Sequence, residues 1–159
     1  MRTGFGSNNV DHCTRLCHAS SVAALMEGIN SGAVSNQVND VENAGLILVI
    51  GSNPTENHPV AATFFKNAVK RGAKLIVMDP RGQSQGIARY ASHVLRFKPG
   101  RDVALLNAML HTIVQEGMVD VQYVQAHTEG YDALKARNSS KKLGIVVNQV
   151  IDDEIAEAS

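Results

Sequence analysis

Near its start, the chain carries two thiols, two imidazoles, a guanidinium and a carboxylate within the eleven residues from Asn8 to His18. The run that follows, from Ala19 to Met26, consists of small residues and helix formers. Polar side chains are costly to bury in a core, whereas the N-terminus of a helix offers free N–H groups and a partial positive charge. A thiolate is favoured there. The sequence therefore indicates a chemical site at this point.

The two cysteines, Cys13 and Cys17, leave simpler interpretations open. Cysteine is among the most buried residue types, so either thiol alone would suit a small core position. A structural zinc site usually takes four ligands, and no second cysteine pair follows downstream. A redox pair is the third interpretation, although the C-x3-C spacing differs from the C-x-x-C motif of thiol oxidoreductases.

Two apolar runs joined by a helix predict the elements that would position such a site. Residues 46–50 and 74–79 read as strands, and the continuous apolar run of the first suits burial on both faces. Pro59 suits the first turn of the intervening helix, and Gly72 suits its C-terminal cap. This strand–helix–strand unit predicts parallel strands with a right-handed crossover. With a third strand over residues 92–96, we expect an α/β fold, a Rossmann-like parallel sheet flanked by helices.

Helical spacing and end signals predict the remaining elements. The helix after Pro59 has its apolar residues at 60, 61, 64, 65, 68 and 69. A second helix follows Asp102 and ends at Gly117, with apolar residues at 103, 106, 109, 110, 113 and 114. We further expect a helix over 19–29, a short helix beginning at 35–38, a helical turn at 87–90, a helix from the N-cap Asp120 to His127, and a loop, strand and terminal helix (152–158) after residue 137.

Three loops follow the predicted strands: Gly51–Pro59, Asp79–Gly82 and Pro99–Asp102. In a parallel sheet, loops at the carboxyl ends of the strands meet at one edge, where ligands bind. The carboxylate of Asp79 could accept two adjacent donors of a guanine base or a ribose diol, while Arg81 and helix-start N–H groups suit phosphate. The set indicates a nucleotide site, although each loop alone is also ordinary turn chemistry. No G-x-G-x-x-G follows the first strand, which argues against an NAD-type fingerprint.

Length and charge limit the class of protein. The 159 residues suffice for one domain with a core. Fifteen basic and fifteen acidic residues balance, so no nucleic-acid or anionic-membrane partner is indicated. The apolar run at 46–50 is far too short to span a membrane. We expect a cytoplasmic protein.

The segment around Cys17 resembles the active-site segment of formate dehydrogenases of the molybdopterin oxidoreductase superfamily. The resemblance rests on Asn8–Asp11, Arg15–His18 and Ser21–Ala23. It implies that Cys17 and His18 are catalytic, with Cys17 ligating molybdenum or tungsten. A soft thiolate suits such a metal, and an adjacent imidazole can take a proton near neutral pH.

The three loops resemble the molybdopterin guanine dinucleotide-binding domain of the same superfamily. The matching runs are G-x-N-P-x-x-x-H-P, D-P-R and P-G-x-D-x-A-L-L-N-A-M, in family order, and the whole match covers about residues 5 to 134. Lys98 is a weaker candidate. The resemblance implies these cofactor-binding residues: Gly51, Asn53, Pro54, Glu56, Asp79, Pro80, Arg81, Gly100 and Asp102.

Together the two resemblances imply a molybdopterin oxidoreductase domain over residues 1–136, with 137–159 unassigned. The function implied is the oxidation of formate to carbon dioxide by a formate dehydrogenase catalytic (alpha) subunit, with electron-transfer subunits or domains as partners. The family's N-terminal iron–sulfur domain and second cofactor-binding domain have no counterpart here. We therefore expect the chain to be part of a longer protein and to be inactive alone.

Three alternatives remain at this stage. One is a non-catalytic nucleotide-binding domain of Rossmann type, and another is a thiol-redox protein using Cys13 and Cys17. Within the superfamily, nitrate reductases are the nearest rivals. The Cys17–His18 pair favours a formate dehydrogenase over them.

Overall fold

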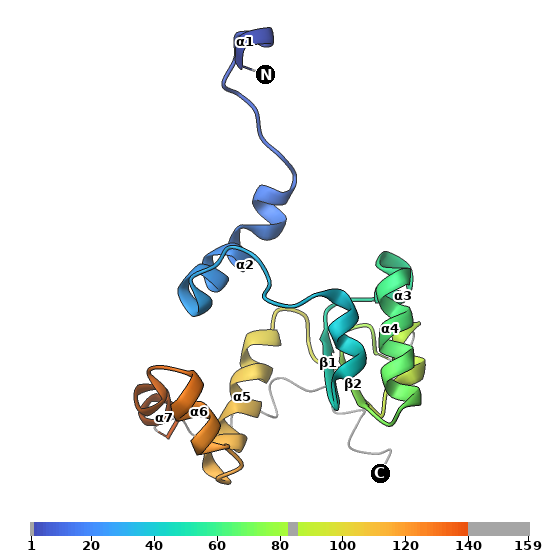
Figure 1. Cartoon of the computed structure of the whole chain (residues 1–159), viewed down its shortest axis with the longest axis vertical. Helices are drawn as coiled ribbons and strands as arrows, with labels where there is room; N and C mark the ends of the chain where they lie inside the picture. The colour runs from blue at the N-terminus through green and yellow to red at the C-terminus, as the bar shows by residue number, and fades with distance from the viewer. Residues whose placement is uncertain (1, 83–85, 140–159) are drawn as a thin grey trace. The chain divides into compact units, whose positions relative to one another are not determined.

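The computed structural model describes residues 2–82 and 86–139, which fall into two compact units (Figure 1). The first unit extends to Asp40, and the second begins at Val41. The single domain expected over residues 1–136 stays a prediction. The loop, strand and helix expected after residue 139 lie outside the described residues.

The first unit consists of two helices, α1 (Arg2–Phe5) and α2 (Thr14–Ile29). Helix α2 starts at Thr14, five residues before the predicted start at Ala19, and ends at Asn30 in the left-handed conformation, with φ 58°. Within the described residues, α2 has no buried side chain. Tertiary packing therefore contributes little to this helix in the chain by itself.

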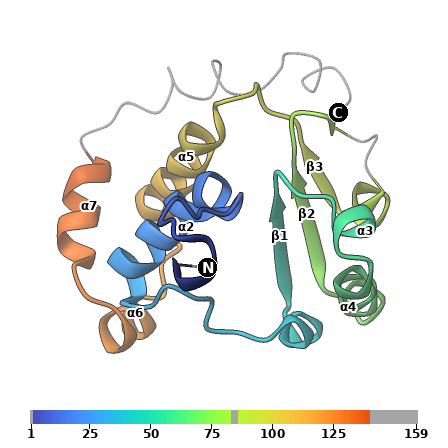
Figure 2. The same ribbon diagram turned by 90° about the horizontal axis from the view of Figure 1, so that it is seen from above.

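The second unit is built on a three-stranded parallel sheet in the order β1–β2–β3 (Figure 2). The strands are β1 (Leu46–Ile50), β2 (Lys74–Met78) and β3 (His93–Leu95). The register pairs Leu46 with Lys74 and Met78 with Leu95. The predicted strand–helix–strand unit and the third parallel strand are confirmed.

Helices surround this sheet, and most were expected. Asp120 accepts a hydrogen bond from the backbone N–H of Tyr123 at 3.0 Å, which confirms it as a cap. Two described helices of the second unit were not predicted, namely α3, which lies in the first loop, and α7; in the first unit, α1 was not predicted either. The helical elements are η1 (Val38–Asn43), α3 (Pro54–Asn57), α4 (Pro59–Lys70), η3 (Ile87–Tyr90), α5 (Asp102–Gln115), α6 (Val121–His127) and α7 (Tyr131–Ser139).

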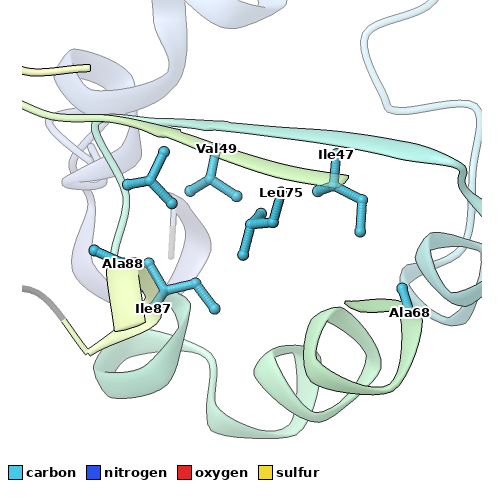
Figure 3. Close-up of a cluster of buried hydrophobic side chains, with 7 residues drawn as sticks. Ile47, Val49, Ala68, Leu75, Ile87 and Ala88 are labelled. Atoms are coloured by element: carbon cyan, nitrogen blue, oxygen red, sulfur yellow. The ribbon is translucent and has the colours of Figure 1, made fainter. Parts of the chain in front are cut away.

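Apolar side chains cover both faces of the sheet. On one face, strands β1 and β2 pack against α4 and η3, and Figure 3 shows this cluster. On the other face, Met78 packs with Phe97 and Leu105, the latter from α5. The helices therefore lie on opposite faces of the sheet, as expected for this fold class (Figure 2). The buried members of the first cluster are Ile47, Val49, Ala68, Leu75, Val77, Ile87 and Ala88.

Strand β1 is less buried than predicted. Ile47 and Val49 are buried, but Leu46 is 62% exposed and Leu48 42% exposed. The apolar run predicted burial on both faces, which is wrong for this chain. Among the described residues, β2 alone has a neighbouring strand on each side, because β1 and β3 are the edge strands of the sheet.

The buried face of α5 also differs from the prediction. The structure buries Leu105, Ala108 and His111 together with Val114, which is the only buried position of the predicted face. Because α5 is apolar around most of its circumference, spacing alone does not select the packed side. Part of the predicted face instead lines an apolar hollow, where Leu110 meets α6 and α7.

Helix α4 shows a smaller deviation. Ala68 is buried as predicted, whereas Val60 is 74% exposed and Ala62 is buried in its place.

A matched pair of valine truncations tests this core. Val77 in β2 is fully buried, whereas Val60 is exposed. We expect Val77→Ala to lower the free energy of unfolding by about 2 kcal/mol, because it removes two packed methyl groups. Val60→Ala should change it by less than about 0.5 kcal/mol, since alanine also has the higher helix propensity. Urea unfolding followed by circular dichroism measures both, and equal effects would contradict the packing.

Candidate active site and nucleotide-binding loops

Cys17 and His18 lie in the first turns of α2, and both are exposed. The backbone N–H of Cys17 donates to the carbonyl of Cys13 at 3.5 Å, a helical hydrogen bond. The two residues therefore lie inside α2, whereas the sequence predicted a helix that begins only after them, at Ala19. Neighbouring helical residues point about 100° apart, so the thiol and the imidazole leave the helix in different directions.

An open hollow of about 530 Å³ lies along this end of α2. His18 and Arg15 line it, together with Val22 one turn further on. Arg15 donates to Asp11 at 2.7 Å. This bond, with a second from the backbone N–H of His12, lowers the pKa of Asp11. The hollow thus combines two imidazoles, from His12 and His18, with the ion pair of Arg15 and Asp11 beside apolar surface.

In the second unit, the loops after the three strands meet at one edge of the sheet. The backbone N–H of Gly51 donates to the carbonyl of Met78 at 2.9 Å, which ties the first loop to β2. The N–H of Asp79 donates to the carbonyl of Leu95 at 3.2 Å. The Nε of Arg96 donates to the carbonyl of Pro80 at 3.0 Å. These bonds hold the starts of the first two loops and the segment after β3 at the same edge of the sheet; the convergence of the Pro99–Asp102 loop with them stays a prediction.

Asp79 is the most buried acid of this edge, with 1% exposure. Its Oδ1 accepts from the backbone N–H of Arg81 at 2.8 Å and from Nε of Arg81 at 3.1 Å. Its Oδ2 accepts from Nη2 of Arg81 at 3.2 Å. The hydrogen bond and charge of Asp79 raise the pKa of Arg81, and the charge of Glu56 adds to the effect. The negative charge of Glu56, in α3 of the first loop, therefore stabilises the positive charge of Arg81 in the second loop.

The first loop is held by a buried amide. Asn53 is 2% exposed, and its Oδ1 accepts from the hydroxyl of Thr55 at 2.5 Å. Pro54 is buried as the first residue of α3, while Glu56 is exposed. Gly51 has φ +61°, in the left-handed region that favours glycine.

The third loop turns into α5. The N–H of Arg101 donates to the carbonyl of Lys98 at 3.0 Å, and Gly100 has φ +78°. Asp102 is the first residue of α5, where a carboxylate is favoured by the helix dipole. Lys98 is exposed.

Gly86 is a residue of this region that the sequence analysis missed. A Cβ at this position would collide with the hydroxyl of Thr55 and lie 3.2 Å from its Cβ. Its signal, a glycine four residues after Gly82, is too common in loops to be informative alone.

The structure thus links the first two loops of the second unit around Asp79 and Arg81, and it describes Cys17 and His18 separately in the first unit. Across residues 2–82 and 86–139, no group of three or more His, Cys, Asp or Glu side chains is placed to hold a metal ion. Cys17 would be a single protein ligand. Over the same residues, no helix has the length and apolar character needed to cross a membrane.

A sequence profile of the molybdopterin oxidoreductase family matches residues 1–154. The chain belongs to the molybdopterin oxidoreductase family. It is 42% identical over 134 residues to the alpha subunit of F420-dependent formate dehydrogenase 1 from Methanococcus maripaludis. It is 43% identical over 131 residues to formate dehydrogenase H from Escherichia coli. These alignments cover 84% and 82% of the chain.

A comparison of the structure with solved structures agrees with this family assignment. The structure resembles that of acetylene hydratase from Pelobacter acetylenicus with a TM-score of 0.61 and 30% identity, over 72% of this chain and 17% of that one. The chain spans 20% and 18% of the lengths of the two formate dehydrogenases. The α/β fold of this molybdopterin oxidoreductase is therefore that of a family domain.

The contact between Gly86 and Thr55 is testable by double substitution. We expect Gly86→Ala to lower the free energy of unfolding by about 1–3 kcal/mol, because the added methyl group collides with Thr55. In a Thr55→Ala background the same change should cost clearly less, since the colliding hydroxyl is gone. Gly45→Ala is the control, because nothing lies within 4 Å of its added Cβ. Additive costs in urea unfolding would contradict the contact.

Proposed function

We propose that the chain is part of a formate dehydrogenase that oxidises formate to carbon dioxide at a molybdenum or tungsten centre. The observation that carries the proposal is the Cys17–His18 pair at the start of α2, in a chain 42–43% identical to two formate dehydrogenases. Electron-transfer subunits or domains would receive the electrons, and an iron–sulfur cluster would lie elsewhere in the whole protein. We place the protein in the cytoplasm, as the sequence analysis suggested.

Cys17 fits the role of metal ligand because its thiol is exposed at the end of a helix. The remaining ligands would come from the pterin dithiolenes, which agrees with the lack of a multi-residue metal cluster in the described chain. When bound, the metal centre supplies the acceptance of two electrons.

His18 and Arg15 would serve formate itself. Both line the hollow beside α2, and a guanidinium suits a carboxylate of formate's size. Formate oxidation breaks the C–H bond, passes two electrons to the metal centre and releases one proton. The imidazole of His18 would take that proton or orient formate, because an imidazole nitrogen can accept a proton or donate a hydrogen bond.

The loops of the second unit would hold one guanine dinucleotide arm of the cofactor. Asp79 already accepts the planar, two-donor edge of a guanidinium, which is the pattern that the N1–H and N2–H edge of guanine presents. Each carboxylate oxygen can accept more than one hydrogen bond. Arg81, Lys98 and the start of α5 would lie toward the phosphates. The remaining proposed contacts come from Gly51, Asn53, Pro54, Glu56, Pro80, Gly100 and Asp102.

Guanine recognition is testable on the chain itself. We expect calorimetry to detect GDP binding, and Asp79→Asn to weaken it about 10- to 100-fold, because one acceptor becomes a donor. Asp132→Asn, an exposed acid of α7, should leave the affinity unchanged. Circular dichroism checks that Asp79→Asn folds. ATP binding as tight as GDP binding would contradict guanine recognition and favour the general nucleotide-binding alternative.

Catalysis is testable in the full-length protein that contains this segment. We expect formate-dependent dye reduction, and a loss of more than about 100-fold in Cys17→Ala, because the proposed metal ligand is removed. Cys13→Ala should retain activity within about twofold. The 159-residue chain alone should reduce no dye. Nitrate turnover without formate oxidation would favour the nitrate reductase alternative, and formate turnover by the chain alone would contradict the need for the other domains.

A further inference from the structure

Arg96 follows β3 and contacts the second loop, Asp79–Gly82, which carries the buried acid of the proposed nucleotide site. We propose that Arg96 is a positioning residue of this site. It fixes the peptide group between Pro80 and Arg81, and thereby the orientation of the Asp79 carboxylate. The family resemblance does not imply this role for Arg96. The orienting role depends on contacts within the chain, and only its effect on guanine rests on the proposed function.

Two hydrogen bonds hold the peptide group between Pro80 and Arg81 from opposite sides. The Nε of Arg96 donates to the carbonyl oxygen of Pro80 at 3.0 Å. The N–H of Arg81 donates to Oδ1 of Asp79 at 2.8 Å. Because a trans peptide group is planar, its carbonyl and its N–H point in opposite directions and turn together. The bond from Arg96 therefore also keeps the N–H of Arg81 directed at Asp79.

The loop leaves this peptide group few other ways to turn. The ring of Pro80 fixes its own φ angle, so the orientation of the peptide plane depends on ψ of Pro80 and φ of Arg81. The turn is closed by the N–H of Gly82, which donates to the carbonyl of Asp79 at 3.1 Å. Gly82 has φ +69°, a conformation that glycine adopts without strain. One hydrogen bond on each side of the plane is thus enough to set its orientation.

The side chain of Arg96 reaches the carbonyl of Pro80 along a defined path. The N–H of Asp79 donates to the carbonyl of Leu95 at 3.2 Å, which places the backbone of Arg96 beside the start of the loop. The aliphatic stem of Arg96 then lies against Gly82, since a Cβ added to this glycine would be 3.4 Å from Cδ of Arg96. These two contacts bring Nε to the carbonyl that it binds.

The orientation of the Asp79 carboxylate decides what it can accept from a ligand. Guanine would present its N1–H and N2–H side by side, so both carboxylate oxygens must face the base in one plane. The guanidinium of Arg81 is a weak reference for this plane, because its side chain is 58% exposed. The N–H of Arg81 belongs to the main chain and is the firmer reference. Without the bond from Arg96, this N–H can turn away from Oδ1.

Two uncharged substitutions isolate the hydrogen bond of Arg96. Glutamine carries an N–H donor, Nε2, as far along its side chain as Nε of arginine, whereas methionine has a similar length and no donor. Both remove the positive charge, so any lost attraction for phosphate is the same in the two variants. Because Arg96 is exposed, we expect both variants to fold. Arg89→Met, at an exposed arginine of η3, is the control for a loss of charge.

Amide hydrogen exchange, measured by NMR without nucleotide, tests the orienting role. We expect the N–H of Arg81 to exchange at least about fivefold faster in Arg96→Met than in the unmodified chain, because its bond to Asp79 opens more often. In Arg96→Gln and in Arg89→Met the rate should stay within about twofold. Equal exchange rates in Arg96→Met and Arg96→Gln would overturn the proposal.

Calorimetry with GDP and inosine diphosphate tests the consequence for guanine. Inosine diphosphate lacks the N2 amino group, so a carboxylate that faces N1–H and N2–H should prefer GDP by about tenfold. We expect Arg96→Met to reduce this preference to less than about threefold, and Arg96→Gln to retain it. An unchanged preference in Arg96→Met would overturn the proposal. A chain that binds neither nucleotide would instead contradict the proposed guanine site, and the exchange rate of the Arg81 N–H would still decide the role of Arg96.

Discussion

The burial of β2 is the constraint on which the second unit depends. Leu75, Val77 and Met78 have no exposed surface, because β2 lies between two parallel strands and between two apolar clusters. A strand held on all four sides cannot shift its register without moving apolar side chains to the wrong face. The residue that follows it, Asp79, is therefore held at a defined point of the sheet edge.

Burial gives the carboxylate of Asp79 its distinctive properties. At 1% exposure an unpaired charge would be very costly, and Arg81 compensates through a backbone N–H and two guanidinium nitrogens. The same arrangement leaves the side chain of Arg81 58% exposed. The buried carboxylate and the partly exposed guanidinium beside it are the features that support the proposed binding of guanine and phosphate.

In the first unit, the side chains of the proposed active site are not held by a buried core. Helix α2 carries its chemical groups on exposed turns, and the described chain offers no core to fix them. Local bonds do this work: Asp11 accepts from Arg15, and His12 contacts both Thr14 and Cys13. Short-range polar contacts of this kind order the side chains relative to each other. They contribute little to stability, because they are exposed to water.

The sequence by itself determined the parallel strands, the helix between β1 and β2 and the positions of the three loops, because these follow from apolar runs, glycine and proline over short stretches. The motifs in the sequence also indicated the molybdopterin oxidoreductase family, which the family profile confirms. Only the tertiary structure decided which side of α5 is buried, that Leu48 of β1 is exposed, and that Gly86 must lie against Thr55. These features depend on contacts between residues distant in the chain. The local spacing of apolar residues does not show which other element packs against a helix. It therefore could not determine which of several similarly apolar sides of α5 is buried.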